Sequence, residues 1–385
     1  MRGSVFKRSK SWAFAVEVSR DENGTRTRHQ KAGFKTKKDA QAAMHEVLHR
    51  LGSGEYVAPA NLTLASYLRN QWLPAIRASV RPSTFESYRM TVEKHIALTI
   101  GGTKLQAVTP AKLNALYADL LAKGRSDGKG GLSPKSVRNC HVIIRKALGD
   151  AVRWSLIARN PAAFAEPPKL TQAGDRTMMT WTPQQARSFL QALSDDRLYA
   201  AWLLALSTGM RRGEILGLRW SDTDLETGKL AIRQTLITVN YEIQFSTPKT
   251  SRGRRSIALD KTTANVLRAH RKAQLEERMA IGATRYIDND LVFCRLDGSP
   301  MHPDLFSQTF DRAVAKSGLP RIRLHDLRHT YATISLEAGV HPKVVSERLG
   351  HATVAFTLDR YSHAVPGMQE DAAEKVAALI LGSDG

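Results

Sequence analysis

The sequence has few cysteines and no long apolar run, and both absences narrow the class of protein. Only Cys140 and Cys294 occur among 385 residues, so we expect neither a disulfide framework nor a four-cysteine or Cys₂His₂ zinc site. No stretch approaches the roughly 18 consecutive apolar residues that mark a membrane-spanning helix. The basic N-terminus is not followed by the apolar segment of a secretory signal. We therefore expect an intracellular protein with no membrane partner.

Acidic residues are scarce relative to basic ones. The chain has 57 Lys and Arg against 36 Asp and Glu, which gives a formal net charge of +21 at pH 7. Such an excess is uncommon in enzymes of small molecules and common in proteins that hold a polyanion. Hydrophobic residues make up 42% of the chain, which excludes disorder throughout. At roughly 100–200 residues per domain, the length predicts several domains, and the charge predicts binding to nucleic acid.

Residues 1–57 are predicted to form a small unit of three strands and a helix. Apolar residues alternate from Trp12 to Val18, as on one buried strand face, Asn23-Gly24 is a hairpin signal, and Thr36 precedes a helix as its N-cap. This unit has 12 Lys and Arg against 6 Asp and Glu. We favour a sheet that contacts DNA over a merely solvated basic sheet, with contacts from Arg26, Arg28 and Lys31.

Residues 62–165 are predicted to be all-helical. Apolar residues recur at helical spacing from Leu64, and Thr109-Pro110 and Ser133-Pro134 place a proline at the first helical position. The expected DNA contacts of this unit are Arg81, Lys135 and Arg138. Prolines in residues 161–176 predict a stiff linker to the third unit.

Residues 176–385 are predicted to be mostly helical, with a small β-sheet in residues 228–259. Thr182, with Gln three positions later, marks a helix start. Further helices are predicted at 261–281, 303–316, 325–338, 342–349, 353–362 and 367–381. The final helix is amphipathic, and packing on its own unit and docking on a neighbouring copy both stay open.

Three clusters in this third unit carry candidate catalytic side chains. Arg211 follows a glycine at the start of a helix, where its guanidinium can project beside free N–H groups toward an anion. His325 and Arg328 are three residues apart and share one helix face. His351 follows Leu349-Gly350, ten residues before Tyr361. A weaker candidate, Lys249, lies in the turn region of the β-segment.

These residue types suit phosphoryl transfer without a metal ion. Arginine forks bind phosphate oxygens bidentately, and histidine exchanges protons near neutral pH. A tyrosine hydroxyl can attack phosphorus to give a covalent phosphoester. The sequence has no Asp and Glu cluster with metal-ligand spacing beside them. We therefore expect cationic side chains to stabilise the charge, with no metal and no other cofactor.

The order Thr-Gly-x-Arg211, His325-x-x-Arg328, Leu-Gly-His351 and Tyr361 resembles the tyrosine recombinases, also called the phage integrase family. The motif match covers about residues 205–365. With less specificity, the helical unit is similar to the family's core-binding domain, and residues 1–57 resemble the arm-binding domain of phage and integrative-element integrases. The resemblance implies a multidomain, mainly α fold with an α+β arm-binding domain, an all-helical core-binding domain and a mostly helical catalytic domain with a small β-sheet.

The resemblance also implies a role for each candidate residue. Arg211 and Arg328 would clamp the scissile phosphate, and Tyr361 would be the nucleophile of a 3′-phosphotyrosyl intermediate. His325 would transfer a proton, and His351 would hydrogen-bond the phosphate. The remaining expectations are Lys249 as the acid for the departing 5′ oxygen, Glu214 in support of the active site, and Arg252, Arg254 and Arg255 as further DNA contacts.

An integrase of this kind implies specific partners. These are double-stranded DNA with core and arm sites, a homotetramer on that DNA, and an excision factor and a host DNA-bending protein as further candidates. The expected location is the bacterial cytoplasm, at the nucleoid. Tyr331 stays open as a rival nucleophile, and His329 and His363 as rival histidines. The alternative functions are a type IB topoisomerase and a DNA-binding regulator with degraded catalysis.

Overall fold

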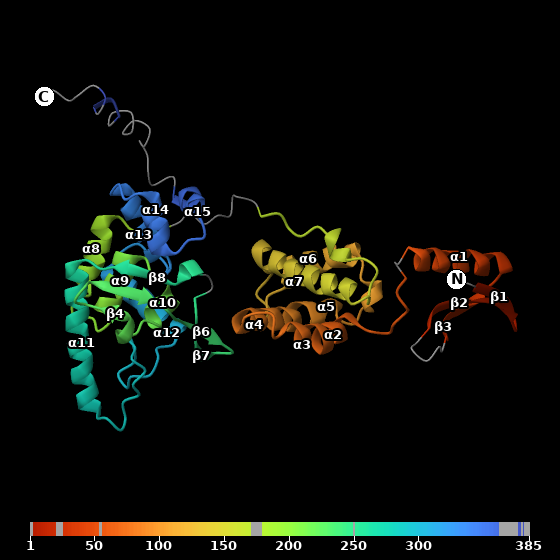
Figure 1. Ribbon diagram of the computed structural model, residues 1–385, viewed down its shortest axis with the longest axis horizontal. Coiled ribbons are helices and arrows are strands. Elements are labelled where there is room, and N and C mark those ends of the chain that lie inside the picture. Colours follow the sequence, from red (N-terminus) through yellow and green to blue (C-terminus); the bar gives the residue numbers. More distant parts are fainter. Residues whose placement is uncertain are drawn as a thin grey trace. The chain divides into compact units, whose positions relative to one another are not determined.

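The computed structural model describes residues 3–20, 26–53, 56–170, 179–248, 251–361, 376–378 and 380. The chain is mainly helical with small antiparallel sheets, as the sequence predicts (Figure 1). Contacts divide it into two compact units, Met1–Gln172 and Ala173–Gly385. None of the helices in the described ranges has both the length and the apolarity that a membrane crossing requires.

The N-terminal segment forms the predicted three strands and helix. Strands β1 (Gly3–Arg8), β2 (Ser11–Arg20) and β3 (Arg26–Phe34) pair antiparallel in that order, and α1 (Lys37–Gly52) packs against β2. Phe14 and Val16 are buried as predicted. The Thr36 hydroxyl accepts a hydrogen bond from the Asp39 amide at 3.1 Å, which confirms the predicted cap. The Asn23-Gly24 turn lies outside the described residues.

The predicted all-helical segment is built from four rods, two of which contain a π-helical turn. Proline at the first helical position and a Ser or Thr cap begin the third and fourth rods, since the hydroxyls of Thr109 and Ser133 accept from amides three residues later. The rods are α2 (Leu64–Tyr67), Leu68–Trp72 and α3 (Leu73–Ile76); α4 (Pro82–Thr91), Val92–Ile96 and α5 (Ala97–Ile100); α6 (Pro110–Lys123); and α7 (Pro134–Arg153).

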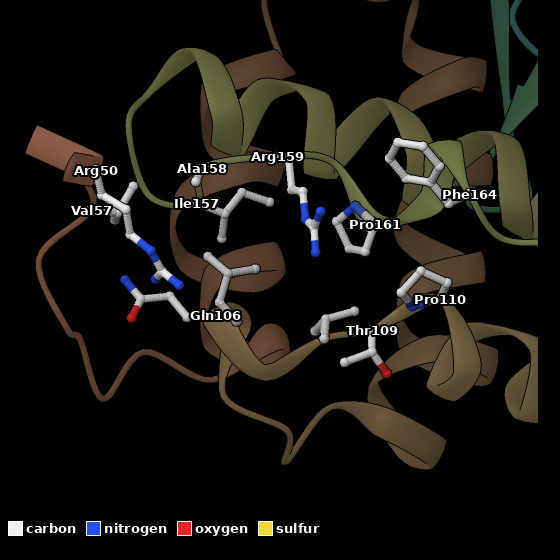
Figure 2. Close-up of a pocket in the computed structure, with 12 residues that line it drawn as sticks. Arg50, Val57, Gln106, Thr109, Pro110, Ile157, Ala158, Arg159, Pro161 and Phe164 are labelled. Atoms are coloured by element: carbon white, nitrogen blue, oxygen red, sulfur yellow. The ribbon is translucent and has the colours of Figure 1, made fainter. Parts of the chain in front are cut away.

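Pro161 belongs to the helical segment and not to the predicted linker. Pro161–Ala163 is a 3₁₀ turn whose first two residues are buried. The Asn160 side chain fixes this turn, because it accepts from the Ala162 amide at 2.9 Å and donates to the Arg145 carbonyl at 2.8 Å. The turn lines a groove of this segment together with Thr109 (Figure 2). Pro161 is therefore the first residue of a packed turn, and the predicted linker starts too early.

The third predicted unit contains a small sheet and a hairpin among helices. The sheet has the antiparallel order β4-β5-β8, and β6 pairs with β7 in the hairpin. The strands are β4 (Thr223–Asp224), β5 (Lys229–Ile232), β6 (Thr235–Val239), β7 (Glu242–Ser246) and β8 (Arg255–Ala258). The helices are α8 (Pro183–Ala192), α9 (Tyr199–Thr208), α10 (Arg212–Leu216), α11 (Lys261–Ile281), α12 (Pro303–Ser317), α13 (Asp326–Glu337), α14 (Pro342–Leu349) and α15 (Val354–Tyr361).

Helix α9 lies at the centre of this unit. It is apolar on nearly every face and packs against α8, α11 and α13 (Figure 1). Trp202 of α9 stacks on Phe306 with ring centroids 4.7 Å apart, and aromatic burial of this kind dominates core energetics. Packing against these helices therefore holds the end of α9 in a defined position. The predicted helix 367–381 falls outside the described residues except for 376–378 and 380.

Candidate active site

The C-terminal end of α9 fixes the start of the site. Gly209 ends this helix in the left-handed region, at φ 64°. A Cβ atom there would lie 2.5 Å from side-chain atoms of both Tyr331 and Leu349, so only glycine allows α13 and α14 to approach this closely. Arg211 comes two residues later as the N-cap of α10. Its backbone N–H donates to a carboxylate oxygen of Glu214 at 2.9 Å.

Glu214 is buried and is shared by two guanidinium groups. Arg211 donates to its Oε1 from Nη1 at 2.8 Å, and Arg255 donates to both of its oxygens at 3.0 and 2.9 Å. Burial alone would raise the pKa of Glu214, but Arg255 and Arg211 hold this pKa below its usual value. The carboxylate therefore stays ionised and fixes the direction in which Arg211 projects.

The structure corrects the expectation that Arg255 contacts DNA. Its side chain is only 7% exposed, and its Nε donates to the Arg348 carbonyl at 2.6 Å. The signal was present in the sequence, because residue 255 shares a strand face with Ile257, which is buried. Arg252 and Arg254 are exposed, as are Arg28, Lys31, Lys135 and Arg138. The DNA contacts expected of these residues stay predictions.

Arg328 is the most deeply buried cation of the site. It lies in the first turn of α13 and is 4% exposed. Its Nη1 donates to the Gly209 carbonyl at 2.7 Å, and its Nη2 donates to the Leu349 carbonyl at 2.6 Å. Burial, and then the charge of Arg211, lower the pKa of Arg328 to about 9. The guanidinium is thus held between the ends of α9 and α14 and keeps its charge at neutral pH.

His351 lies directly after the glycine that ends α14. Gly350 has φ 66°, and its carbonyl accepts from Nη2 of Arg211 at 3.2 Å. The Nδ1 of His351 hydrogen-bonds the Thr357 hydroxyl at 2.8 Å. Burial, and then Arg328, lower the pKa of His351 to about 3. This imidazole is therefore neutral at physiological pH.

Tyr361 is the last residue of α15 and is 1% exposed. Its ring stacks on His351 with centroids 6.4 Å apart and an interplanar angle of 7°. Its hydroxyl lies 2.7 Å from Nδ1 of His329. Burial raises the pKa of Tyr361, although the charges of Arg328 and Arg360 act in the opposite direction. The phenol is therefore protonated at rest and points into a site with several cations.

His325 completes the described set at the start of α13. Its ring packs edge-on against His329 with centroids 5.1 Å apart. His325 is exposed, but partial loss of solvent around its ring, and then the charge of Arg328, lower its pKa. The structure thus brings together six of the seven residues that the sequence nominated: Arg211, Glu214, His325, Arg328, His351 and Tyr361. The seventh, Lys249, lies outside the described residues.

Of the alternative candidates, Tyr331 and His329 lie in different surroundings. The Tyr331 hydroxyl accepts a hydrogen bond from Arg348, so this tyrosine is tied to α14. His329, treated above only as a rival histidine, lies directly on the Tyr361 hydroxyl. His329 is four residues after His325, so both rings lie on one helix face. This spacing is the sequence signal that could have identified His329 as part of the site. His363 lies outside the described residues.

The side chains gathered here are of the types that suit phosphoryl transfer through a tyrosine ester. The chain matches the model of the phage integrase family over residues 180–367, an arm DNA-binding domain over 4–51 and the N-terminal SAM-like domain of phage integrases over 64–121. The chain belongs to the phage integrase family and is a tyrosine recombinase.

Several known proteins are similar to the chain along most of its length. A XerC-like tyrosine recombinase of Caldanaerobacter subterraneus is 28% identical over 381 residues, which cover 95% of each chain. The integrase of Mycobacterium phage L5 is 28% identical and covers 84% of this chain and 81% of its own. The solved structure of the Tn1549 transposon integrase with transposon right-end DNA has a TM-score of 0.67 at 23% identity, covering 82% of this chain and 100% of that one.

Proposed function

We propose that this recombinase cleaves and rejoins duplex DNA at specific sites through Tyr361, and thereby integrates or excises a mobile element. The observation that carries the proposal is the cluster in which the buried Tyr361 hydroxyl, two guanidinium groups and the neutral imidazoles of His329 and His351 share one site. A tyrosine ester of the phosphate conserves the energy of the cleaved bond, so strand joining needs no nucleotide cofactor.

Arg211 and Arg328 are the proposed clamp on the scissile phosphate. Both are anchored from behind, Arg328 on the carbonyls of Gly209 and Leu349 and Arg211 on Glu214. A guanidinium has five N–H donors, so each keeps further donors for phosphate oxygens. Fixed cations around a site of developing charge stabilise the transition state without reorganising.

His351 and His325 are the proposed neutral partners of the phosphate. Because Nδ1 of His351 is held by Thr357, its Nε2 is the nitrogen that would hydrogen-bond a phosphate oxygen. His325 would exchange protons beside Arg328. Since loss of solvent disfavours the charged form of both rings, the positive charge of the site would come from the arginines.

The burial of Tyr361 adds a condition to this mechanism. A side chain that is 1% exposed cannot meet a DNA phosphate until the segments that cover it move. We propose that DNA binding supplies this movement, so that the enzyme alone is inactive. Premature hydrolysis and cleavage at wrong sites would both be limited by such a resting state.

Lys249 is the proposed acid for the departing 5′ oxygen. This oxygen must gain a proton, and arginine holds its protons too tightly to supply one. Lys249→Ala should slow cleavage by about 10²–10⁴-fold, the usual contribution of a positioned acid. A substrate with sulfur as the bridging 5′ atom needs no such proton and should restore the rate. If sulfur fails to restore it, the acid is another group, with His325 as the next candidate.

We further propose three functional domains and a set of partners. The domains are an arm-type DNA-binding domain at 1–57, a core-binding domain at 62–165 and the catalytic domain at 176–385. Four copies would act together on paired sites. In support, a lambda integrase tetramer bound to a Holliday junction has a TM-score of 0.55 with this chain at 18% identity. An excision factor and a host DNA-bending protein are further proposed partners.

The test of the function is covalent trapping on DNA. The wild-type chain, incubated with the DNA that flanks its own gene and then denatured, should leave a protein–DNA adduct that maps to a core site. Tyr361→Phe should bind the same DNA and form no adduct, while Tyr331→Phe should still form one. The adduct should persist in excess EDTA, since cationic side chains supply the charge stabilisation.

The two alternative functions give different results in the same assay. A type IB topoisomerase would relax plasmids without producing recombinants, and a regulator would bind DNA without forming an adduct. An adduct that survives in Tyr361→Phe, or an absolute need for Mg²⁺ in cleavage, would contradict the proposed mechanism.

A further inference from the structure

We propose that His329 is the general base that takes the proton from Tyr361 during strand cleavage. This inference rests on the proposed function, because it assigns one step of that reaction. Neither the motif order nor the family match assigns His329 a role, and the inference comes from its place in the fold.

The geometry joins His329 directly to the reacting atom. Its Nδ1 lies 2.7 Å from the Tyr361 hydroxyl oxygen, a distance typical of a good hydrogen bond to oxygen. The two rings lie 5.7 Å apart, and both side chains are buried, at 8% and 1% exposure. His329 is a helix residue adjacent to Arg328, so its position relative to the phosphate clamp is fixed by α13.

The chemistry requires a base at this point. A phenol is a weak nucleophile until it loses its proton, and burial makes that loss harder for Tyr361. The other imidazole that stacks on this tyrosine, His351, uses its Nδ1 for Thr357. Within the described ranges, the hydrogen bond to His329 is the one through which the phenolic proton can leave.

His329 is also in the protonation state that a base needs. Burial, and then the neighbouring His325, lower the pKa of His329 to about 4, so the imidazole is neutral and can accept a proton. The charged groups that face it are Asp326 and Arg328 on α13 and Arg360 on α15, and the rings of His325 and His351 also lie near it. Two of these three charges, those of Arg328 and Arg360, would repel protonated His329, which favours early return of the proton.

The proposed step balances in both directions. In cleavage, the Tyr361 oxygen forms a bond to phosphorus, its O–H proton moves to Nδ1 of His329, and the bond from phosphorus to the 5′ oxygen breaks. A separate acid, proposed above as Lys249, gives a proton to that 5′ oxygen. In joining, the 5′ hydroxyl attacks phosphorus and gives its proton to the then neutral Lys249. The bond from phosphorus to the tyrosine oxygen breaks, and protonated His329 returns its proton to that oxygen.

The test uses His329→Asn, which keeps an amide near the position of Nδ1 and cannot act as a base. Single-turnover adduct formation is followed from pH 6 to 9 on a nicked duplex that spans the trapped core site. The variant should be slower by about 10²–10⁴-fold, the usual contribution of a base. Its rate should rise about tenfold per pH unit, because hydroxide must then remove the proton. A purely structural role would leave the slope unchanged.

Two further measurements separate His329 from the other groups. A bridging 5′ sulfur should restore Lys249→Ala and leave His329→Asn slow, since the defect of the latter is in the nucleophile. A ring-fluorinated tyrosine at position 361, which has a more acidic phenol, should restore His329→Asn in part. His270→Asn is the matched control, because it replaces a half-buried histidine that bonds the Val292 carbonyl. It should keep the wild-type rate and slope.

The outcomes distinguish this inference from the function on which it rests. If the wild-type chain forms no adduct, the proposed function fails. If it does, and folded His329→Asn matches its rate and pH slope, or is restored by sulfur, then His329 is not the base. His329→Gln serves as the second variant if the Asn variant does not fold, and the same slope is expected of it.

Discussion

At the scale of the residue, the site depends on one buried carboxylate that two arginines share. Glu214 holds Arg211 in its orientation, and Arg255 provides the second compensating charge. Without Arg255, the carboxylate would keep a single ion-pair partner that is itself 41% exposed. Arg255 is therefore a positioning residue, which acts on the phosphate clamp through Glu214.

Replacement of Arg255 should consequently cost stability as well as activity. Arg255→Gln removes one partner of a buried ion pair, a change that typically costs about 3–5 kcal/mol. Urea unfolding measures this loss in the free energy of unfolding, and covalent trapping should show a lower yield. Arg254→Gln is the matched control, since Arg254 is exposed and surface changes usually stay within about 0.5 kcal/mol. Equal unfolding curves for the two variants would refute the assigned role.

Sequence reasoning found residues with a fixed order along the chain and missed those defined by packing. Arg211, Arg328 and Tyr361 belong to spaced motifs, so the order of residues alone is enough to nominate them. His329 and Arg255 acquire their roles from α15 and Glu214, which lie 32 and 41 residues away in sequence. The alternation with Ile257 indicates that residue 255 faces inward, but no neighbouring residue identifies the carboxylate with which its guanidinium pairs.

At the scale of the element, the junction of α9, α13 and α14 determines where the catalytic side chains lie. Arg328 bridges the Gly209 and Leu349 carbonyls, and those carbonyls are available because both helices end in glycine. The helix starts and stops were predictable from Thr caps, prolines and glycines. The π-helical turns and the buried Pro161 were not, since both depend on packing within the helical segment.

Gly209→Ala should disturb this junction without removing any catalytic group. The added Cβ would lie 2.5 Å from both Tyr331 and Leu349 at a positive φ, so we expect a loss of about 1–3 kcal/mol and much weaker adduct formation. Gly318→Ala is the matched control. Gly318 ends α12 at φ 68°, with nothing within 4 Å of its Cβ position. A similar loss of adduct in both variants would mean that backbone strain, and not the contact, is responsible.

At the scale of the whole molecule, the buried histidines make stability depend on pH. The folded state lowers the pKa of His329 from 6.5 to about 4, so the unfolded chain binds more protons between these values. The free energy of unfolding should then be fully present above pH 6.5 and fall toward pH 4, by about 3 kcal/mol for this group alone. His351 should extend the loss to lower pH.

Urea unfolding at pH 7.5, 6 and 5 checks this dependence. His329→Asn should reduce the slope of unfolding free energy against pH, because the variant lacks the group that takes up the proton. His45→Asn, a change at an exposed histidine of α1, should leave the slope as it is in the wild type. A slope that is the same in all three chains would show that other groups cause the loss.

Residues 1–57 form a unit with its own buried side chains, and the last prediction concerns their deletion. Among the described residues, the core of the helical segment begins at Leu64 and extends to Ala165, so the deletion removes no member of that core. The N-terminal sheet buries its own Phe14 and Val16 and presents Arg28 and Lys31 to solvent. The truncated chain should therefore fold and still form the Tyr361 adduct on its core site.

The truncated chain should lose the ability to bind a second, separate DNA sequence. Footprints of the full chain on the DNA that flanks its gene should show the core site and separate arm sites, and only the latter should disappear. Fewer phosphate contacts should also make binding less sensitive to salt, since each released counterion adds to the slope. Arg28→Ala with Lys31→Ala in the full chain should weaken the arm footprint while leaving the fold intact. If the footprints of the full and truncated chains coincide, the basic sheet reads no separate site and the arm-binding assignment is wrong.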